Sequence, residues 1–278
     1  MDLLLKVLDD AGIEKAMLLY PSSDAHLKLG GWSRVCDLYN RGIGKKLKEY
    51  PDRLLGAGIL PMDSPHEMVD EIDKMQDLGL IGLSLASSHE GRYLDDDGFS
   101  PVWERAEHDN LPVFVHSQTI NPIGFDRVKD PLLMPAVEYL FDITMCAGTM
   151  LMSGVFNRYK SLNVVFAHFA GVLPFLTDRF DSTYSMLRSR DMVKDLESAP
   201  SKILKNVFVD ISGVKSPSLL TMALDFFGPQ HILWGSDFPA QKNPAESLEA
   251  LETLDIDKKE KENIRGKNLI NLMKKRGE

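Results

Sequence analysis

The chain has 278 residues, 44% of them hydrophobic and 26% charged, a globular composition that excludes disorder, collagen and a coiled coil. Its formal net charge is −9 and its basic residues are scattered apart from one run near the C-terminus, so nucleic acid is not an expected partner. Two cysteines without CxxC spacing exclude a disulfide framework, and no stretch reaches 18 consecutive apolar residues, so we expect a cytoplasmic protein with no membrane partner.

Short apolar runs bounded by glycine, proline or asparagine alternate with segments of helical spacing along the whole chain. This alternation is typical of βαβ units whose parallel strands are buried on both faces. Seven strands are expected, within residues 15–21, 54–61, 81–88, 112–118, 163–171, 207–213 and 232–239.

Three of the intervening helices carry start signals. Ser64, Pro65 and Glu67 predict a capping box, and the Ser-Pro pairs at 100–101 and 216–217 repeat the signal. After the fourth strand we expect an insertion at 121–131, a candidate active-site loop, and then an apolar helix at about 132–159. No linker interrupts the series, which predicts a single domain over residues 1–278.

Seven strands fit either an open doubly wound sheet or a (β/α)8 barrel that lacks one strand. An open sheet gathers its polar residues at one switch point, whereas a barrel presents them at the C-terminal ends of many strands. The polar residues that follow strands here are Ser87, Ser88, His116, His168, Asp210 and Asp237. Their distribution favours the α/β class and a (β/α)8 TIM barrel.

Three of these residues can carry chemistry. His116, His168 and Asp237 each lie where a buried strand ends. Any one of them alone is more simply a structural histidine or a helix-capping aspartate, but a barrel gathers its strand ends around one cavity. Two imidazoles and a carboxylate are suitable ligands for zinc, which lowers the pKa of a bound water to about 7, and Asp237 is then placed to accept its proton.

The segments at 51–61, 111–118, 163–181, 232–239 and 264–273 together resemble those of the amidohydrolase superfamily. More narrowly they resemble the amidohydrolase-related branch that contains aminocarboxymuconate-semialdehyde decarboxylase and γ-resorcylate decarboxylase. This resemblance implies a deformed barrel in which His116 and Asp237 ligate one divalent metal, usually zinc, with His168 beside the metal-bound water. It also implies a homodimer, in which Arg179 reaches the neighbouring subunit's site and binds a substrate carboxylate. From the residues alone, Arg179 is equally a surface partner of Asp178 or Asp181.

The chain departs from this family at its start. Members begin with a strand ending in His-x-His or Glu-x-His, which supplies two metal ligands, and neither motif is present. We therefore expect a barrel without its first strand, with two open edges and a metal held by His116, Asp237 and at most one more ligand. His26 is a weak candidate for that ligand. An internal start, a non-catalytic relative and a strand from another polypeptide all explain the departure, and the retained site residues favour the first.

The leading hypothesis is a metal-dependent enzyme that decarboxylates or hydrolyses a small carboxylated substrate, with Asp237 and His168 as catalytic residues. The alternative is a non-catalytic barrel that serves binding or oligomerisation. A serine hydrolase is excluded because no Gly-x-Ser-x-Gly occurs. Arg127 is the preferred substrate-binding residue of the loops, because arginine binds a carboxylate through two hydrogen bonds. Further candidates for substrate contact are Trp32, Arg34, Phe125 and Gln241.

Overall fold

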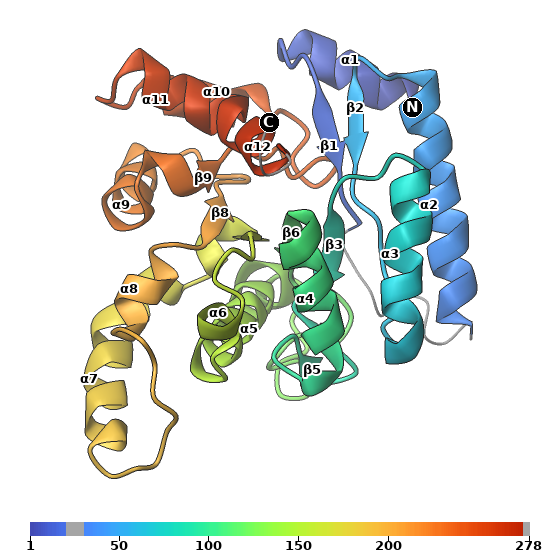
Figure 1. Ribbon diagram of the computed structural model, residues 1–278. Coiled ribbons are helices and arrows are strands. Elements are labelled where there is room, and N and C mark those ends of the chain that lie inside the picture. Colours follow the sequence, from blue (N-terminus) through green and yellow to red (C-terminus); the bar gives the residue numbers. More distant parts are fainter. Residues whose placement is uncertain (21–30, 275–278) are drawn as a thin grey trace.

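The computed structural model describes residues 1–20 and 31–274, and every one of the seven expected runs contains a strand (Figure 1). Pro21, at the end of the first run, and His26 lie outside the described residues. The strands are β1 (Ala16–Leu18), β2 (Leu54–Gly56), β3 (Leu83–Ala86), β6 (Val113–His116), β7 (Val164–Phe166), β8 (Phe208–Asp210) and β9 (Ile232–Leu233).

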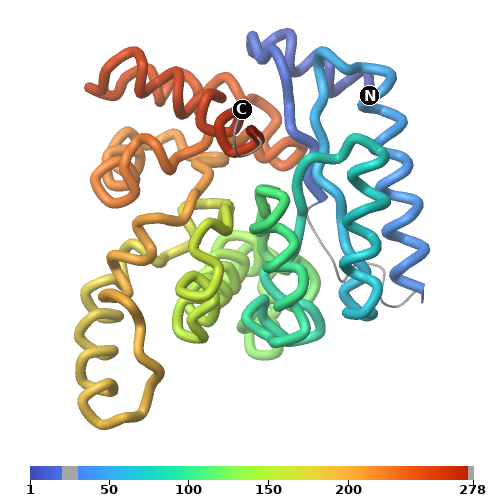
Figure 2. Tube along the Cα trace, in the orientation of Figure 1, coloured from blue at the N-terminus to red at the C-terminus, as the bar shows by residue number. Residues whose placement is uncertain are grey.

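The strands pair in parallel and in the order of the sequence. One sheet runs β3-β6-β7-β8-β9, a second pairs β1 with β2, and a parallel bridge between Gly58 and Leu83 joins them. This is the order of a (β/α) barrel, whereas a doubly wound sheet reverses direction at a switch point. The trace in Figure 2 accordingly turns from blue to red around the molecule and returns its C-terminal segment to the first strands.

Alternate strand residues face opposite sides of this curved sheet, as strand geometry requires. Val113, Val115 and Val164 belong to the large core between the sheet and the outer helices. Phe114 and Val165, with the opposite parity, belong to a smaller apolar cluster. That cluster lies inside the barrel and also contains Ala57, Leu233 and Leu272, with Met17, Phe208 and Leu269 against it. Because side chains two residues apart on a strand point to the same face, His116 points inward like Phe114, and Asp210 points inward like Phe208.

Helices follow the strands and cover their outer face (Figure 1). A short hairpin, β4 (Ser88–His89) with β5 (Arg92–Tyr93), was not among the predicted elements. The helices are α1 (Asp2–Asp10), α2 (Trp32–Glu49), α3 (Met68–Asp77), α4 (Ser100–Asp109), α5 (Tyr139–Met152), α6 (Val155–Arg158), α7 (Thr177–Arg188), α8 (Pro200–Leu204), α9 (Pro217–Phe227), α10 (Ala245–Glu252), α11 (Lys258–Glu262) and α12 (Asn268–Leu272). In the part of the chain that is described, none of them has the length and apolar character that crossing a membrane requires.

Helices begin near the predicted signals, but two details of the prediction are wrong. Ser64 makes no side-chain cap, because the Glu67 backbone N–H donates to the Ser64 carbonyl instead, at 2.8 Å. The Glu67 carboxylate does not return to the helix start either, since it accepts a hydrogen bond from Ser33 Oγ at 2.6 Å. The apolar helix at 132–159 is three pieces. It opens with a π-helical turn, η4 (Met134–Glu138), and α5 ends before Gly154, whose φ of +83° breaks the helix.

The sequence predicted two open sheet edges, and the structure shows that one of them is covered. The edge of β9 is covered by the C-terminal segment, since Trp234 N–H donates to the Ile264 carbonyl at 2.9 Å and Asn268 Nδ2 donates to the Ile232 carbonyl at 2.7 Å. β1 is the other end of the strand order, and all three of its residues are only half-buried, so burial on both faces is wrong for this strand. The C-terminal helix α12 thus closes part of the interior.

Removing the Leu272 side chain tests this closure. Leu272 is 5% exposed within the inner cluster, so Leu272→Ala is expected to lower the free energy of unfolding by about 2–4 kcal/mol. Ile270 lies on the same short helix but is 52% exposed, so Ile270→Ala is the matched control and changes stability by about 0.5 kcal/mol or less. Urea unfolding measures both, and equal losses would contradict the assignment of α12 to the core.

Candidate metal centre

His116, His168 and Asp237 converge at the C-terminal ends of the strands. His116 is the last residue of β6, His168 follows β7, and Asp237 follows β9. One ligand atom of each lies within 4.8 Å of the others, and the two imidazole rings meet edge to face at a centroid distance of 5.5 Å. Two imidazoles and one carboxylate with an open position form the donor set of catalytic zinc sites. The three residues therefore fit a divalent cation.

Backbone strain places two of these side chains. His168 begins a 3₁₀ turn, η5 (His168–Ala170), in which all three residues have φ between 51° and 61°, and Asp237 has φ of 53°. Such conformations cost of order 1–3 kcal/mol for each non-glycine residue and persist only where surrounding contacts enforce them. Gly171 is required beside the turn, because a Cβ there would lie 2.1 Å from the Leu140 carbonyl oxygen.

Asp210 supports the same turn. Its Oδ1 accepts hydrogen bonds from the backbone N–H of His168 and of Ser212, both at 3.0 Å. Sequence reasoning counted Asp210 among the polar strand ends but left it out of the site. Its position as the last residue of β8 was the available signal.

Each histidine presents Nδ1 to a backbone carbonyl oxygen. His116 Nδ1 lies 3.2 Å from the Ser117 carbonyl oxygen and 3.3 Å from Ser117 Oγ, and His168 Nδ1 lies 3.3 Å from the Ser212 carbonyl oxygen. A carbonyl oxygen only accepts and a hydroxyl oxygen can accept, so we assign the proton to Nδ1 in each ring. Nε2 is then the nitrogen with a free lone pair, which is the form that binds a metal.

The electrostatics of the cluster favour neutral groups. Burial raises the pKa of Asp237, and Asp210 adds to this, while His168, His116 and a hydrogen bond from Gln241 oppose it. Burial lowers the pKa of His116, and His168 lowers it further. A neutral imidazole is the ligand form of histidine, so His116 is ready to bind a cation at neutral pH.

The two predicted substrate-binding arginines lie at the surface. Arg179 is exposed on α7 and, among the described residues, forms no ion pair with Asp178 or Asp181. Asp181 instead accepts hydrogen bonds from the backbone N–H and hydroxyl of Ser201. Arg127 is exposed in the insertion, where its backbone N–H donates to the Gly124 carbonyl. Neither arginine contacts the three clustered residues.

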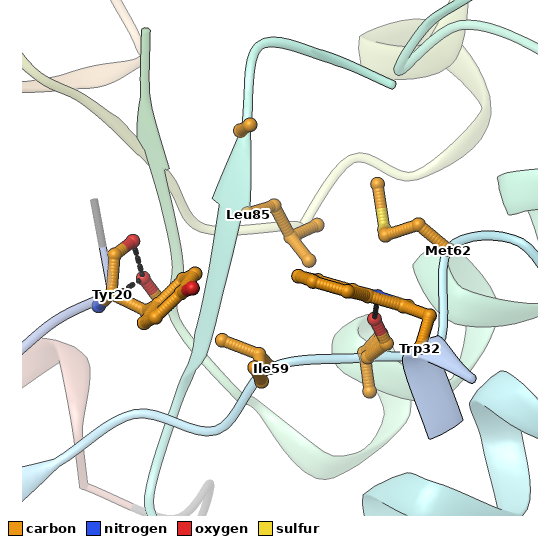
Figure 3. Close-up of a pocket in the computed structure, with 8 residues that line it drawn as sticks. Tyr20, Trp32, Ile59, Met62 and Leu85 are labelled. Atoms are coloured by element: carbon orange, nitrogen blue, oxygen red, sulfur yellow. Dashed lines mark hydrogen bonds between the residues drawn. The ribbon is translucent and has the colours of Figure 1, made fainter. Parts of the chain in front are cut away.

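Of the four other loop residues predicted to contact substrate, only one lies at the cluster. Gln241 belongs to the site, because its side chain hydrogen bonds to Asp237. Trp32 is 2% exposed and is a core residue, with Nε1 donating to the Leu60 carbonyl at 2.7 Å (Figure 3). Arg34 is exposed on α2, and Phe125 is half-buried with Lys129 Nζ 4.0 Å above its ring.

Figure 3 shows a small pocket whose lining is mainly apolar. Its volume is about 10 Å³, enough for one water. Ala86, one of its lining residues, is the register partner of His116, so one wall of the pocket lies on the strand next to that histidine. The other lining residues are Tyr20, Trp32, Ile59, Leu60, Met62, Ser84 and Leu85.

Comparison with known proteins shows the family of the chain. The model of the family described as amidohydrolase matches residues 24–269. Over 261 residues the chain is 26% identical to 2-amino-3-carboxymuconate-6-semialdehyde decarboxylase of Dictyostelium discoideum, covering 90% of this chain and 71% of the relative. It is 24% identical over 283 residues to γ-resorcylate decarboxylase of a Polaromonas species, covering 97% and 86%.

Solved structures share the fold. 5-Carboxyvanillate decarboxylase from Sphingomonas paucimobilis superposes with a TM-score of 0.83 at 24% identity, covering 97% of this chain and 81% of that one. A dihydroxybenzoic acid decarboxylase from Polaromonas, with bound manganese and the inhibitor 2-nitroresorcinol, gives 0.83 at 21% identity, covering 98% and 85%. These likenesses confirm the barrel architecture expected from the sequence.

Replacing Asp237 is expected to separate metal binding from stability. Asp237→Asn removes a carboxylate ligand and should weaken Mn²⁺ binding by about 100-fold or more in calorimetry at pH 7. In EDTA the same change should raise the unfolding midpoint at pH 7. A carboxyl group whose pKa is higher in the folded than in the unfolded chain destabilises the fold when it is ionised. The rise in unfolding midpoint caused by Asp237→Asn should therefore shrink as the pH falls towards about 4, where the carboxyl group is protonated in the wild-type chain. Asp225→Asn, on the exposed side of α9, is the control and should change neither property.

Proposed function

We propose, for a chain that belongs to the amidohydrolase family, that it is a metal-dependent decarboxylase of a small carboxylated aromatic substrate. The observation that carries this proposal is the convergence of His116, His168 and Asp237 at the strand ends of a barrel. The relatives over most of the chain are decarboxylases, which favours decarboxylation over hydrolysis at the same residues.

His116 and Asp237 hold the divalent metal in this proposal, and His168 lies beside it. When bound, the cation polarises the substrate and neutralises charge that develops during the reaction. Asp237 lies in the site and carries a carboxyl group, so it is the residue we assign to pass a proton to the ring carbon that bears the substrate carboxylate. The bond from that carbon to the carboxylate then breaks, its electron pair returns to the ring, and carbon dioxide leaves. We propose zinc as the metal, with manganese as the competing choice because a similar structure contains it.

Loss of His116 tests the catalytic assignment. With Zn²⁺ or Mn²⁺ supplied, carbon dioxide release from a panel of hydroxybenzoates and aminocarboxymuconate analogues is measured for each variant. His116→Ala is expected to lower kcat/KM by about 10³-fold or more, because a metal ligand is lost. His66→Ala, whose side chain is 81% exposed on the first turn before α3, is the control and keeps full activity.

The outcomes separate the competing functions. Turnover of esters, lactones or amides without carbon dioxide release would replace decarboxylation by hydrolysis. No turnover and no metal binding by the wild-type chain would favour the non-catalytic barrel.

An exposed apolar stripe supports a homodimer. Leu133, Val137, Phe141 and Met145 recur every fourth residue, from the residue before η4 into α5, and are 40–46% exposed. Phe175, on the turn η6 (Leu173–Leu176) that packs beside α5, is 68% exposed. Contiguous exposed apolar surface marks an interaction site. We infer that a second copy of the chain covers this stripe.

Such a dimer gives Arg179 a role. Arg179 lies four residues beyond Phe175, exposed and without an ion pair among the described residues, so its guanidinium is available to a partner. We propose that it binds the carboxylate of a substrate held in the partner's site. Arg127, in the insertion after His116, is the candidate for the same task within one subunit.

Mixing inactive variants distinguishes these two arginines. Arg179→Ala and His116→Ala are each expected to lower kcat/KM by about 100-fold or more. A refolded equal mixture should recover about a quarter of wild-type activity, because half the dimers are hybrids with one intact site. Full activity of Arg179→Ala, together with a loss of about 100-fold in Arg127→Ala, would assign the carboxylate to Arg127.

We propose the cytoplasm as the location of the protein. Cys36 and Cys146 are both buried and unpaired, and burial raises the pKa of each thiol. Buried neutral thiols of this kind are typical of reducing compartments.

A further inference from the structure

Asp142 on α5 is a buried carboxylate at the centre of a hydrogen-bond network outside the metal cluster. It is 1% exposed. Oδ2 accepts hydrogen bonds from the hydroxyls of Ser87 and Ser88, and Oδ1 accepts from Tyr93 Oη at 3.2 Å and from the Ile123 backbone N–H at 3.0 Å. A carboxylate has about four acceptor positions, so all of them are used.

The Oδ2 side of this network leads to the metal cluster through Ser87. The Ser87 backbone N–H donates to the His116 carbonyl at 2.7 Å, and Ser87 Oγ accepts from the Gln118 backbone N–H at 2.8 Å. Ser87 therefore holds the chain on both sides of Ser117. Because its hydroxyl has one proton, donation to Asp142 directs a lone pair towards Gln118.

Ser117 is the residue that sets the His116 ring, since its carbonyl oxygen lies 3.2 Å and its hydroxyl oxygen 3.3 Å from His116 Nδ1. Ser87 and Ser117 are fully buried, and Gln118 is 1% exposed, so solvent does not replace these bonds. A shift of the Ser117 carbonyl turns the imidazole and moves Nε2. Partners that orient a metal-binding histidine in this way change metal affinity by about 10- to 100-fold when they are lost.

We propose that Asp142 is a positioning residue of the metal centre, which acts through Ser87 to orient His116. This inference rests on the proposed metal-binding function. Asp142 acts at a sequence distance of 55 residues from Ser87 and is not a member of the metal cluster.

The Oδ1 side of the same carboxylate supplies the control. Tyr93, on the β4–β5 hairpin, donates to Asp142 Oδ1, whereas Ser87 donates to Oδ2. Tyr93→Phe thus removes one hydrogen bond from Asp142 and leaves the Ser87 branch intact. If the role of Asp142 is purely structural, Tyr93→Phe and Asp142→Asn should both weaken metal binding. Each loss of affinity should then be in proportion to that variant's loss of folding stability.

The test measures Mn²⁺ affinity by calorimetry and the His116 tautomer in the metal-free chain by ¹⁵N chemical shifts, with urea unfolding as the check on folding. In Asp142→Asn the side-chain NH₂ cannot accept the hydrogen bonds that the carboxylate oxygen accepts, so Ser87 loses its partner. Mn²⁺ affinity should then fall by about 10- to 100-fold. The ¹⁵N signals of His116 should change from those of the Nδ1–H tautomer alone to those of a mixture of both tautomers. Ser87→Ala should match it, and the double variant should be no worse than either single one. Tyr93→Phe should keep the affinity within about twofold and the tautomer unchanged.

The inference would be overturned if a folded Asp142→Asn chain kept the wild-type Mn²⁺ affinity and the wild-type His116 tautomer. It would also be overturned if Tyr93→Phe changed both as much as Asp142→Asn does. The two proposals fail separately. A wild-type chain that binds Mn²⁺ but releases no carbon dioxide would remove the decarboxylase proposal and leave the affinity test in force. A chain that binds no metal would remove the proposed function, while the tautomer readout would still decide whether Asp142 orients His116.

Discussion

The parallel register of β3, β6, β7, β8 and β9 is the constraint on which the rest of the molecule depends. It aligns the strands so that inward residues form an apolar cluster at one level and a polar cluster at their C-terminal ends. A slip of one residue in β6 would turn His116 outward and Phe114 with it, because strand side chains alternate. Packing of the barrel interior and assembly of the metal cluster are therefore consequences of the same backbone hydrogen bonds.

The site then adds strain that the register alone does not produce. His168 to Ala170 and Asp237 leave the strands in left-handed conformations. Hydrogen bonds with Asp210 and with Thr144 on α5 hold the first of these turns, and Gly171 leaves room for α5 beside it. If β7 simply continued, His168 would point to the outer face, opposite to Val165. The strained turn brings its side chain into the cluster instead. Conformations of this kind concentrate at functional sites, where rigid surroundings maintain them.

Helix α5 connects the two kinds of surface that the proposed function needs. Its inner side carries Asp142, which is tied to the segment after His116 and to the start of the insertion. Its outer side carries the exposed apolar stripe, which we assign to a second copy of the chain. The proposed dimer contact and the proposed metal centre therefore share one structural element, helix α5.

The sequence by itself determined the seven strands, most of the helix positions and the three residues of the metal cluster. These follow from strand and helix periodicity and from the position of His116, His168 and Asp237 after apolar runs, which are local properties of the chain. The capping box at Ser64 and the unbroken helix at 132–159 were wrong, because Glu67 found a partner in Ser33 and the chain turns at Gly154.

Only the tertiary structure decided how the cluster is supported and how the barrel is closed. Asp210 reaches His168 across 42 residues, Asp142 reaches Ser87 across 55, and Asn110 reaches the carbonyl of Leu272 across 162. Contacts of this range leave no periodic signal in the sequence, because each donor and acceptor meets its partner only after the strands are in register. Which side of α5 stays exposed and how the His116 ring is oriented are decided there for the same reason.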